Sequence, residues 1–193
     1  VIINSVFSLI LLRKRQKLTL LIIQRRIMNR TNNLKVVCYN ASLQKLALSF
    51  RSGNDYLDQF LRQEISLDDN YGKTYVLISE DNEEIIGYYN LGLGYVEQEE
   101  YGIVKKIGGA VHINNFALAE KYHGVVQTYT EQGIRINLSD ILLDECMQKI
   151  EEIRKKYIGF AFVTLASTRE GYHLYERNGF EKLDDDMSFS REE

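Results

Sequence analysis

Residues 174–180 have the sequence LYERNGF and close a predicted short helix over residues 168–178. Gly179 marks the end of this helix, because glycine adopts the left-handed backbone found after a helix C-terminus without steric cost. Before the helix, the apolar run at residues 159–165 (GFAFVTL) predicts a buried strand. A last strand is expected near residues 181–190. The end of the chain therefore predicts a strand, a short helix and a strand, in that order.

A longer helix precedes this segment. Apolar residues recur at near-fourfold spacing over residues 138–157 and mark one helix face, with Asn137 or Ser139 as the expected cap. Residues 109–119 (GAVHINNFALA) predict a central strand before this helix, and residues 120–137 predict a polar loop between the two. A strand, a helix and a further strand require a crossover, so the two strands are expected to pair in parallel.

The first half of the chain adds further elements. Residues 43–50 are apolar and predict a strand, and residues 52–55 (SGND) have the S-x-x-D pattern of a helix that runs to about Ile65. Residues 74–79 and 85–96 are rich in β-branched and aromatic side chains and predict a hairpin around a polar turn. The fold class is therefore α/β (α+β), with a mixed, mostly antiparallel central sheet and flanking helices.

Composition limits the classes of function. The 193 residues are 45% hydrophobic and suffice for one substantial core, so residues 28–193 are expected to form a single domain. Residues 1–27 hold six of the 24 basic side chains and no acidic one, which leaves 18 basic and 27 acidic residues in the rest. Such an acidic body argues against a broad nucleic-acid-binding surface. The two cysteines have no metal-ligand or disulfide spacing, which predicts no metal site and a cytoplasmic setting.

The N-terminal segment, residues 1–27, is apolar and basic. Its apolar run over residues 1–12 is too short to span a bilayer, and the basic cluster follows it where a signal peptide would have it in front. No membrane partner is therefore expected. Either the segment is a basic amphipathic helix lying on a surface, or it is an extension outside the domain, which would then begin at Met28. The second interpretation is favoured, and expression from Met28 tests it.

Residues 174–180 match a terminal motif of the type (L/F)-Y-x-x-x-G-F, and in this the chain resembles the GNAT (GCN5-related) N-acetyltransferases. The resemblance covers roughly residues 43–190, and residues 72–89 look like the toxin-type bacterial branch. It implies an acyl-CoA N-acyltransferase-like fold whose central parallel strands splay apart. It also implies acetyl-CoA as co-substrate and no metal.

The resemblance further implies which residues act. Tyr175 matches the family's general acid, a neutral phenol that protonates the departing CoA thiolate; the alternative is a tyrosine that only packs in the core. The family stabilises the oxyanion with a backbone amide at the end of a central strand, which here falls near Asn115 to Leu118. It pairs the pantetheine arm with the same strand, here the backbone of Phe116, Ala117 and Leu118; the alternative is a wholly paired core strand. Glu120, at the end of that strand, could accept the amine proton through water.

The expected pyrophosphate loop departs from the family pattern Q/R-x-x-G-x-G/A. Gly124 matches one glycine of that pattern, but the next glycine follows only nine residues later, and Arg135 comes shortly after it. Free amides at a helix N-terminus bind phosphate without glycine, so Ile136, Asn137 and Ser139 are expected to hold the pyrophosphate with Arg135 assisting.

The resulting hypothesis is an N-acetyltransferase that moves an acetyl group from acetyl-CoA to a primary amine of a small molecule or protein. One alternative is a toxin-type aminoacyl-tRNA acetyltransferase with a small antitoxin-like protein partner; the acidic body otherwise argues against nucleic acid. A second alternative is a non-catalytic binding module with the same fold. The sequence is compatible with a homodimer and does not determine the oligomeric state.

Overall fold

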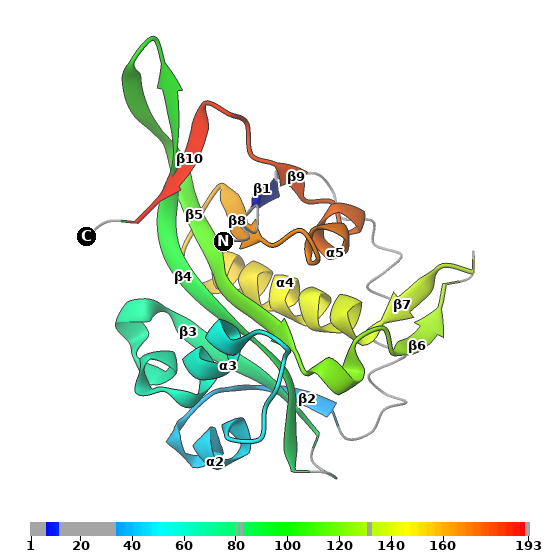
Figure 1. Cartoon of the computed structure of the whole chain (residues 1–193). Helices are drawn as coiled ribbons and strands as arrows, with labels where there is room; N and C mark the ends of the chain where they lie inside the picture. The colour runs from blue at the N-terminus through cyan, green and yellow to red at the C-terminus, as the bar shows by residue number, and fades with distance from the viewer. Residues whose placement is uncertain (1–6, 12–33, 80, 82, 131–132, 192–193) are drawn as a thin grey trace. The chain divides into compact units, whose positions relative to one another are not determined.

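The computed structural model describes residues 7–11, 34–79, 81, 83–130 and 133–191 (Figure 1). These residues form two compact units. Unit 1 contains residues 7–11, 91–114 and 149–191, and unit 2 contains residues 34–79, 81, 83–90, 115–130 and 133–148. Two strands and one helix contribute a part to each unit: β4 (Glu84–Glu100), β5 (Ile103–Leu118) and α4 (Leu138–Lys156). None of the described helices is both long and apolar enough to cross a membrane.

Unit 1 is built on a sheet in which β5 pairs in parallel with β8 (Phe162–Ser167). Because α4 lies between these strands in the sequence, the predicted crossover and its parallel pairing are confirmed. Antiparallel strands complete this sheet: β1 (Phe7–Leu11) lies between β8 and β9 (Glu181–Lys182), and β10 (Met187–Ser190) pairs with β4.

Strand β1 comes from the segment that the sequence placed outside the domain. Its backbone pairs with β8 over its whole length, from Phe7 opposite Ser167 to Leu11 opposite Val163. Leu9 and Ile10 are only 1% and 4% exposed. Residues 7–11 therefore belong to the sheet of unit 1 and form neither a surface helix nor a tail. The rest of residues 1–27 lies outside the described residues.

Strands β4 and β5 are joined by a tight turn at Tyr101 and Gly102, whose φ angles are 53° and 77°. Positive φ at both central residues is typical of a type I′ turn, whose twist matches that of the two strands it joins. The strands predicted at residues 85–96 and 109–119 are thus confirmed, and each extends further towards this turn. Strand β10 runs beside β4 (Figure 1), where the Ser190 hydroxyl donates to the Glu97 carboxylate at 2.7 Å.

Unit 2 has a second run of sheet, in the order β2-β3-β4-β5, with short helices around it. Tyr88 on β4 lies in its core, with its ring 5.6 Å from that of Phe50 and 6.1 Å from that of Phe60. The Tyr88 hydroxyl donates to the carbonyl of Leu57 at 2.7 Å. This aromatic cluster packs α3 against the sheet of unit 2. The elements of unit 2 before β4 are β2 (Leu34–Cys38), η1 (Ala41–Leu43), α2 (Gln44–Ala47), α3 (Asp55–Arg62), η2 (Glu64–Leu67), η3 (Asp69–Tyr71) and β3 (Lys73–Ser79).

The strand predicted at residues 43–50 was wrong, because this stretch is helical in η1 and α2 and the strand β2 lies before it. The Asn40 side chain accepts a hydrogen bond from the Ser42 amide at 3.0 Å and so begins the first helical turn. Ala47 and Phe50, three residues apart, are both buried in the core of unit 2. A short apolar run satisfies a strand and a buried helical turn equally, and here tertiary packing decided between them.

The helix predicted from residues 52–55 is confirmed as α3, but Ser52 does not cap it. The Asn54 side chain accepts from the amides of Tyr56 and Leu57, at 3.0 and 3.3 Å. Ser52 instead donates its amide and its hydroxyl to the buried carboxylate of Asp58, at 2.8 and 2.7 Å. Asp58, a residue within α3, therefore holds the loop that precedes this helix.

Candidate functional site

Tyr175 lies on α5 (Tyr172–Arg177), which ends in a Schellman motif. Gly179 has a φ of 90°, and its amide donates to the Glu176 carbonyl at 3.0 Å. The next amide, of Phe180, donates to the Tyr175 carbonyl at 3.1 Å, and the rings of Tyr175 and Phe180 meet edge to face at 5.8 Å. The quoted motif thus specifies a helix end, and this helix end fixes the position of Tyr175.

The Tyr175 side chain is buried, with 7% of its surface exposed. Its ring also packs on the turn between β8 and α5, where a Cβ added to Gly171 would lie 3.6 Å from the ring. The ring of Tyr175 is therefore packed in the core, as the alternative interpretation expected. The role of its hydroxyl as a general acid stays a prediction.

The predicted donor strand is the end of β5 in unit 2. The ladder between β5 and β8 runs only from Ala110 to Ile113 among the described residues, although β5 itself continues to Leu118. On its other side β5 neighbours β4, and the amide of Ala119, just beyond β5, donates to the Ile86 carbonyl at 2.8 Å. The ladder between β5 and β8 thus ends at Ile113, before the predicted residues 116–118 at the end of β5.

Asn115 lies in this last stretch of β5, and the sequence singled out its backbone but not its side chain. It is 5% exposed, and its side-chain oxygen has no hydrogen-bond partner among the described residues. A buried acceptor left unpaired costs about 1–3 kcal/mol, so such groups tend to occur where a ligand or water completes them. No sequence pattern distinguishes this asparagine from its neighbour Asn114.

Glu120 directly follows β5 and begins η4 (Glu120–Tyr122). Its amide donates to the Arg51 carbonyl at 2.8 Å, and its carboxyl carbon lies 3.7 Å from where a Cβ would stand on Gly53. The exposed carboxylate of Glu120 therefore lies over the loop that precedes α3. Nearby, a ring nitrogen of His123 lies 2.9 Å from the Leu118 carbonyl, which ties the loop after η4 to the end of β5.

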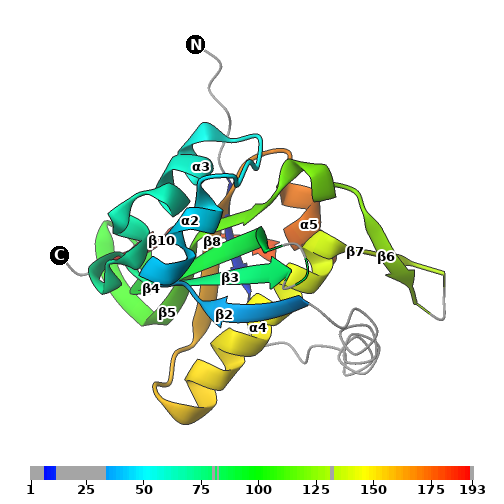
Figure 2. The ribbon, with the colours of Figure 1, turned by 90° about the horizontal axis from the view of Figure 1, so that it is seen from below.

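The polar loop predicted at residues 120–137 is largely a β-hairpin of β6 (Val126–Tyr129) and β7 (Arg135–Asn137), so that prediction was wrong. Figures 1 and 2 show this hairpin extending from the segment that joins η4 to α4. The backbone of Thr130 makes two hydrogen bonds at the hairpin turn. Its amide donates to the Ile134 carbonyl at 2.8 Å, and its carbonyl accepts from the Gly133 amide at 2.9 Å. The widely spaced glycines that depart from the family pattern are thus explained, because Gly133 serves the hairpin turn with a φ of 78°.

The first turn of α4 follows this hairpin directly. The Leu138 amide donates to the Val125 carbonyl at 3.1 Å, and the Asn137 amide donates to the Asp140 carboxylate at 2.9 Å. Ile136 is buried, and Arg135 is exposed on β7. The structure therefore gathers Ile136, Asn137 and Ser139 around the helix start. Asp140 was missed, although an acidic residue three positions after a cap has the spacing of a capping box.

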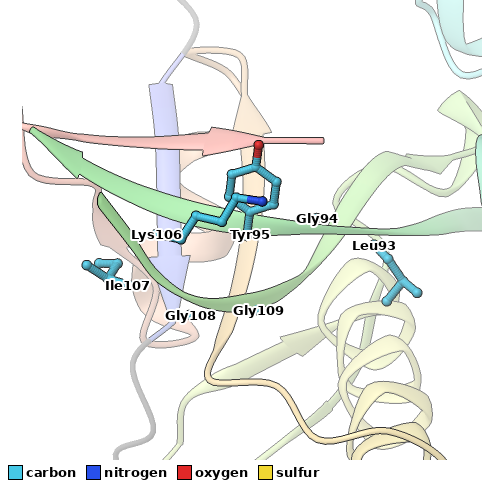
Figure 3. Close-up of a pocket in the computed structure, with 7 residues that line it drawn as sticks. All are labelled: Leu93, Gly94, Tyr95, Lys106, Ile107, Gly108 and Gly109. Carbon is cyan, nitrogen blue, oxygen red and sulfur yellow. The ribbon is translucent and has the colours of Figure 1, made fainter. Parts of the chain in front are cut away.

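A hollow of about 530 Å³ lies elsewhere, on the part of the β4–β5 hairpin that belongs to unit 1 (Figure 3). The Lys106 amine lies 3.8 Å from the centre of the Tyr95 ring, and none of the predicted site residues lines the hollow. The described residues also hold no group of three or more potential metal ligands. The lining residues are Leu93, Gly94, Tyr95, Lys106, Ile107, Gly108 and Gly109.

No protein-family model and no curated protein matches the sequence. Solved structures do match in fold. A Tyr-to-Phe mutant of KacT is 18% identical with a TM-score of 0.61, covering 82% of this chain and 94% of that one. A Tyr-to-Phe mutant of the AtaT toxin is 17% identical with a TM-score of 0.59 and coverages of 82% and 89%. AtaTR bound with AcCoA is 17% identical with a TM-score of 0.60 and coverages of 82% and 94%.

This likeness shows that the chain has the fold of the KacT and AtaT structures. The predicted fold class is confirmed, including the mixed sheet and the parallel pairing of β5 with β8. At these identities the likeness concerns the fold, so the chemistry must be argued from this chain's own residues.

Proposed function

We propose that this chain is an N-acetyltransferase that moves an acetyl group from acetyl-CoA to a primary amine by direct attack. The observation that carries the proposal is the parallel pairing of β5 with β8, whose ladder runs from Ala110 to Ile113 while β5 continues to Leu118, in a chain whose fold is that of a structure bound with AcCoA. The backbone amides and carbonyls of a strand recur at regular spacing. The amide groups of a pantetheine arm would pair with those of Phe116, Ala117 and Leu118.

The proposed reaction forms a C–N bond and breaks the thioester C–S bond. The backbone at Phe116, Ala117 and Leu118 would orient the thioester and stabilise the oxyanion, because fixed amides need no reorganisation in the transition state. The Tyr175 hydroxyl would give its proton to the CoA thiolate. Glu120 would take the amine proton through a water molecule. Direct attack by an amine requires neither a covalent intermediate nor a metal.

The phosphates of the donor would lie at the start of α4. Ile136, Asn137 and Ser139 surround this helix end, Gly124 opens the segment that leads to it with a φ of 70°, and Arg135 is the nearest basic residue in sequence. A helix N-terminus carries a partial positive charge that favours an anion. Arg135 would add a full charge.

A second candidate acceptor is an aminoacyl-tRNA, whose α-amino group is also a primary amine. It is supported by the similar structure of AtaT complexed with acetyl-methionyl-tRNAfMet. The AtaT toxin is also solved bound to the C-terminus of the antitoxin AtaR, which supports a small antitoxin-like partner for this chain. The 27 acidic against 18 basic residues after residue 27 favour a small-molecule or protein amine instead. A cytoplasmic location and a homodimer complete the proposal.

The deciding experiment is the thermal melting of the purified chain with acetyl-CoA. A ligand that binds only the folded state raises its stability by mass action, by about 2.7 kcal/mol at one hundred times the dissociation constant. Release of free CoA thiol is then followed with a panel of small amines, a lysine peptide and an aminoacyl-tRNA. If millimolar acetyl-CoA leaves the melting temperature unchanged, the chain is a non-catalytic module with this fold.

A further inference from the structure

The first turn of α4 is already occupied by the chain itself. The amide of Asn137 is hydrogen-bonded to Asp140 Oδ2 at 2.9 Å, and the amide of Leu138 is hydrogen-bonded to the Val125 carbonyl at 3.1 Å. Asp140 is the one acidic residue in the first turn of α4 and is 6% exposed. A fixed, buried carboxylate therefore takes the position at this helix end that an anion would favour.

A carboxylate and a phosphate compete at such a position for two reasons. Each accepts hydrogen bonds from the same N–H groups and is attracted by the same positive end of the helix dipole. The Asn137 amide cannot donate fully to both at once. Their negative charges also repel, and a buried charge is screened by salt much less than an exposed one. The hairpin strengthens the effect, because the Val125 carbonyl, which directly precedes β6, takes up the neighbouring amide of Leu138.

We infer that Asp140 is a specificity-determining residue that lowers the affinity of this chain for the phosphate-bearing half of its donor. The inference rests on the proposed function. It implies that the donor is held chiefly by its pantetheine arm along β5. A thioester that lacks the phosphates and the nucleotide, such as S-acetyl-pantetheine, is then nearly as good a donor as acetyl-CoA.

The test compares these two donors on the wild-type chain and on Asp140→Asn. Asparagine keeps an acceptor oxygen for the Asn137 amide and removes the charge. We expect the dissociation constant for acetyl-CoA to fall by about fivefold, from the size of charge effects at helix ends. The constant for S-acetyl-pantetheine should stay within about twofold. Because the Asp140 carboxylate is buried, the gain for acetyl-CoA should change little at high salt.

Two further variants make the result decisive. Asp144→Asn removes the same charge one turn later, where the carboxylate accepts from Gln148 at 2.5 Å, and it should change the preference between the donors much less. Asp140→Gln offers a neutral oxygen at the same position of the capping box if the asparagine variant fails to fold. An equal change for both donors, or no change for either, overturns the role of Asp140 and leaves the proposed function intact. If no variant and no wild-type chain binds either donor, the proposed function itself fails.

Discussion

The motif segment of unit 1, residues 162–180, and the loop segment of unit 2, residues 115–140, differ in how they are built. In the motif segment, hydrogen bonds over three to five residues end α5 at Gly179 and place Tyr175. In the loop segment, the family's short glycine pattern is replaced by a hairpin, and its helix start is capped by Asp140. Local bonds preserve a recognisable sequence, whereas a segment held by tertiary contacts can keep its place with different residues.

The largest expected effect concerns the support of the motif segment. A chain that begins at Met28 lacks β1, which pairs with β8 and buries Leu9 and Ile10. Burial of two such side chains contributes about 3–6 kcal/mol, a large part of the stability of an ordinary domain. We expect unit 1 to unfold or to be severely destabilised, as measured by urea denaturation.

A matched pair of point variants checks the cause. Leu9→Ala should lower the urea midpoint clearly, whereas Ser8→Ala, on the exposed neighbour, should not. A chain from Met28 with unchanged stability would mean that β1 contributes nothing to unit 1.

The next effect concerns the chemistry of the motif segment. Tyr175→Phe removes the proposed acid and keeps the ring against Phe180, so kcat should fall about 100-fold while the melting temperature holds. The measurement is CoA thiol release at saturating acetyl-CoA. Tyr172→Phe, on the same helix, is the control and should retain activity. Equal rates for both variants would remove the proton-donor role.

An acid-dependent loss of stability is expected beside β8. Burial, together with nearby Arg191, lowers the pKa of His112 to about 4, and its Nδ1 lies 2.8 Å from the Thr164 hydroxyl. An unfolded histidine titrates near 6.5, so the unfolded state binds more protons as the pH falls from 6.5 towards 4. Stability is complete above pH 6.5 and should decline by about 2–3 kcal/mol across that window.

Urea midpoints at several pH values measure this slope. His112→Leu should flatten it, and His173→Gln should leave it, because the side chain of His173 is 81% exposed. If stability still falls with pH in His112→Leu, the loss of stability comes from other groups.

The smallest effect concerns packing behind the loop segment. A Cβ on Gly87 would lie 2.7 Å from Leu142 of α4 and 2.8 Å from the carbonyl of Ala117 on β5. Gly87→Ala should therefore cost about 1–2 kcal/mol and weaken acetyl-CoA binding through the displaced strand. Gly159→Ala, with no atom within 4 Å of its added Cβ, is the control for calorimetry and donor titration.

Sequence reasoning succeeded where a pattern was long or local. The helical periodicity of α4, the β-branched and aromatic side chains of β3 and β4 and the helix end at Gly179 all led to elements that the structure contains. It failed at residues 43–50, since a short apolar run has no period of its own, and at residues 120–137, where polar side chains hid a hairpin. The side chains of Asn115 and Asp140 could not be recognised as site candidates from the sequence. Both are buried, and what distinguishes them is a hydrogen bond that Asp140 accepts and one that the Asn115 oxygen does not make with the described residues.

By itself the sequence determined the class of fold, the parallel crossover and the helix end that follows Tyr175, because each depends on residues close together in the chain or on a repeating period. The tertiary structure decided three other features: that residues 7–11 enter the sheet beside β8, that the ladder between β5 and β8 ends at Ile113 although β5 runs to Leu118, and that Asp140 caps the start of α4. These are pairings between distant segments. Their outcome depends on which backbone groups and side chains find partners in three dimensions, and no local pattern encodes that competition.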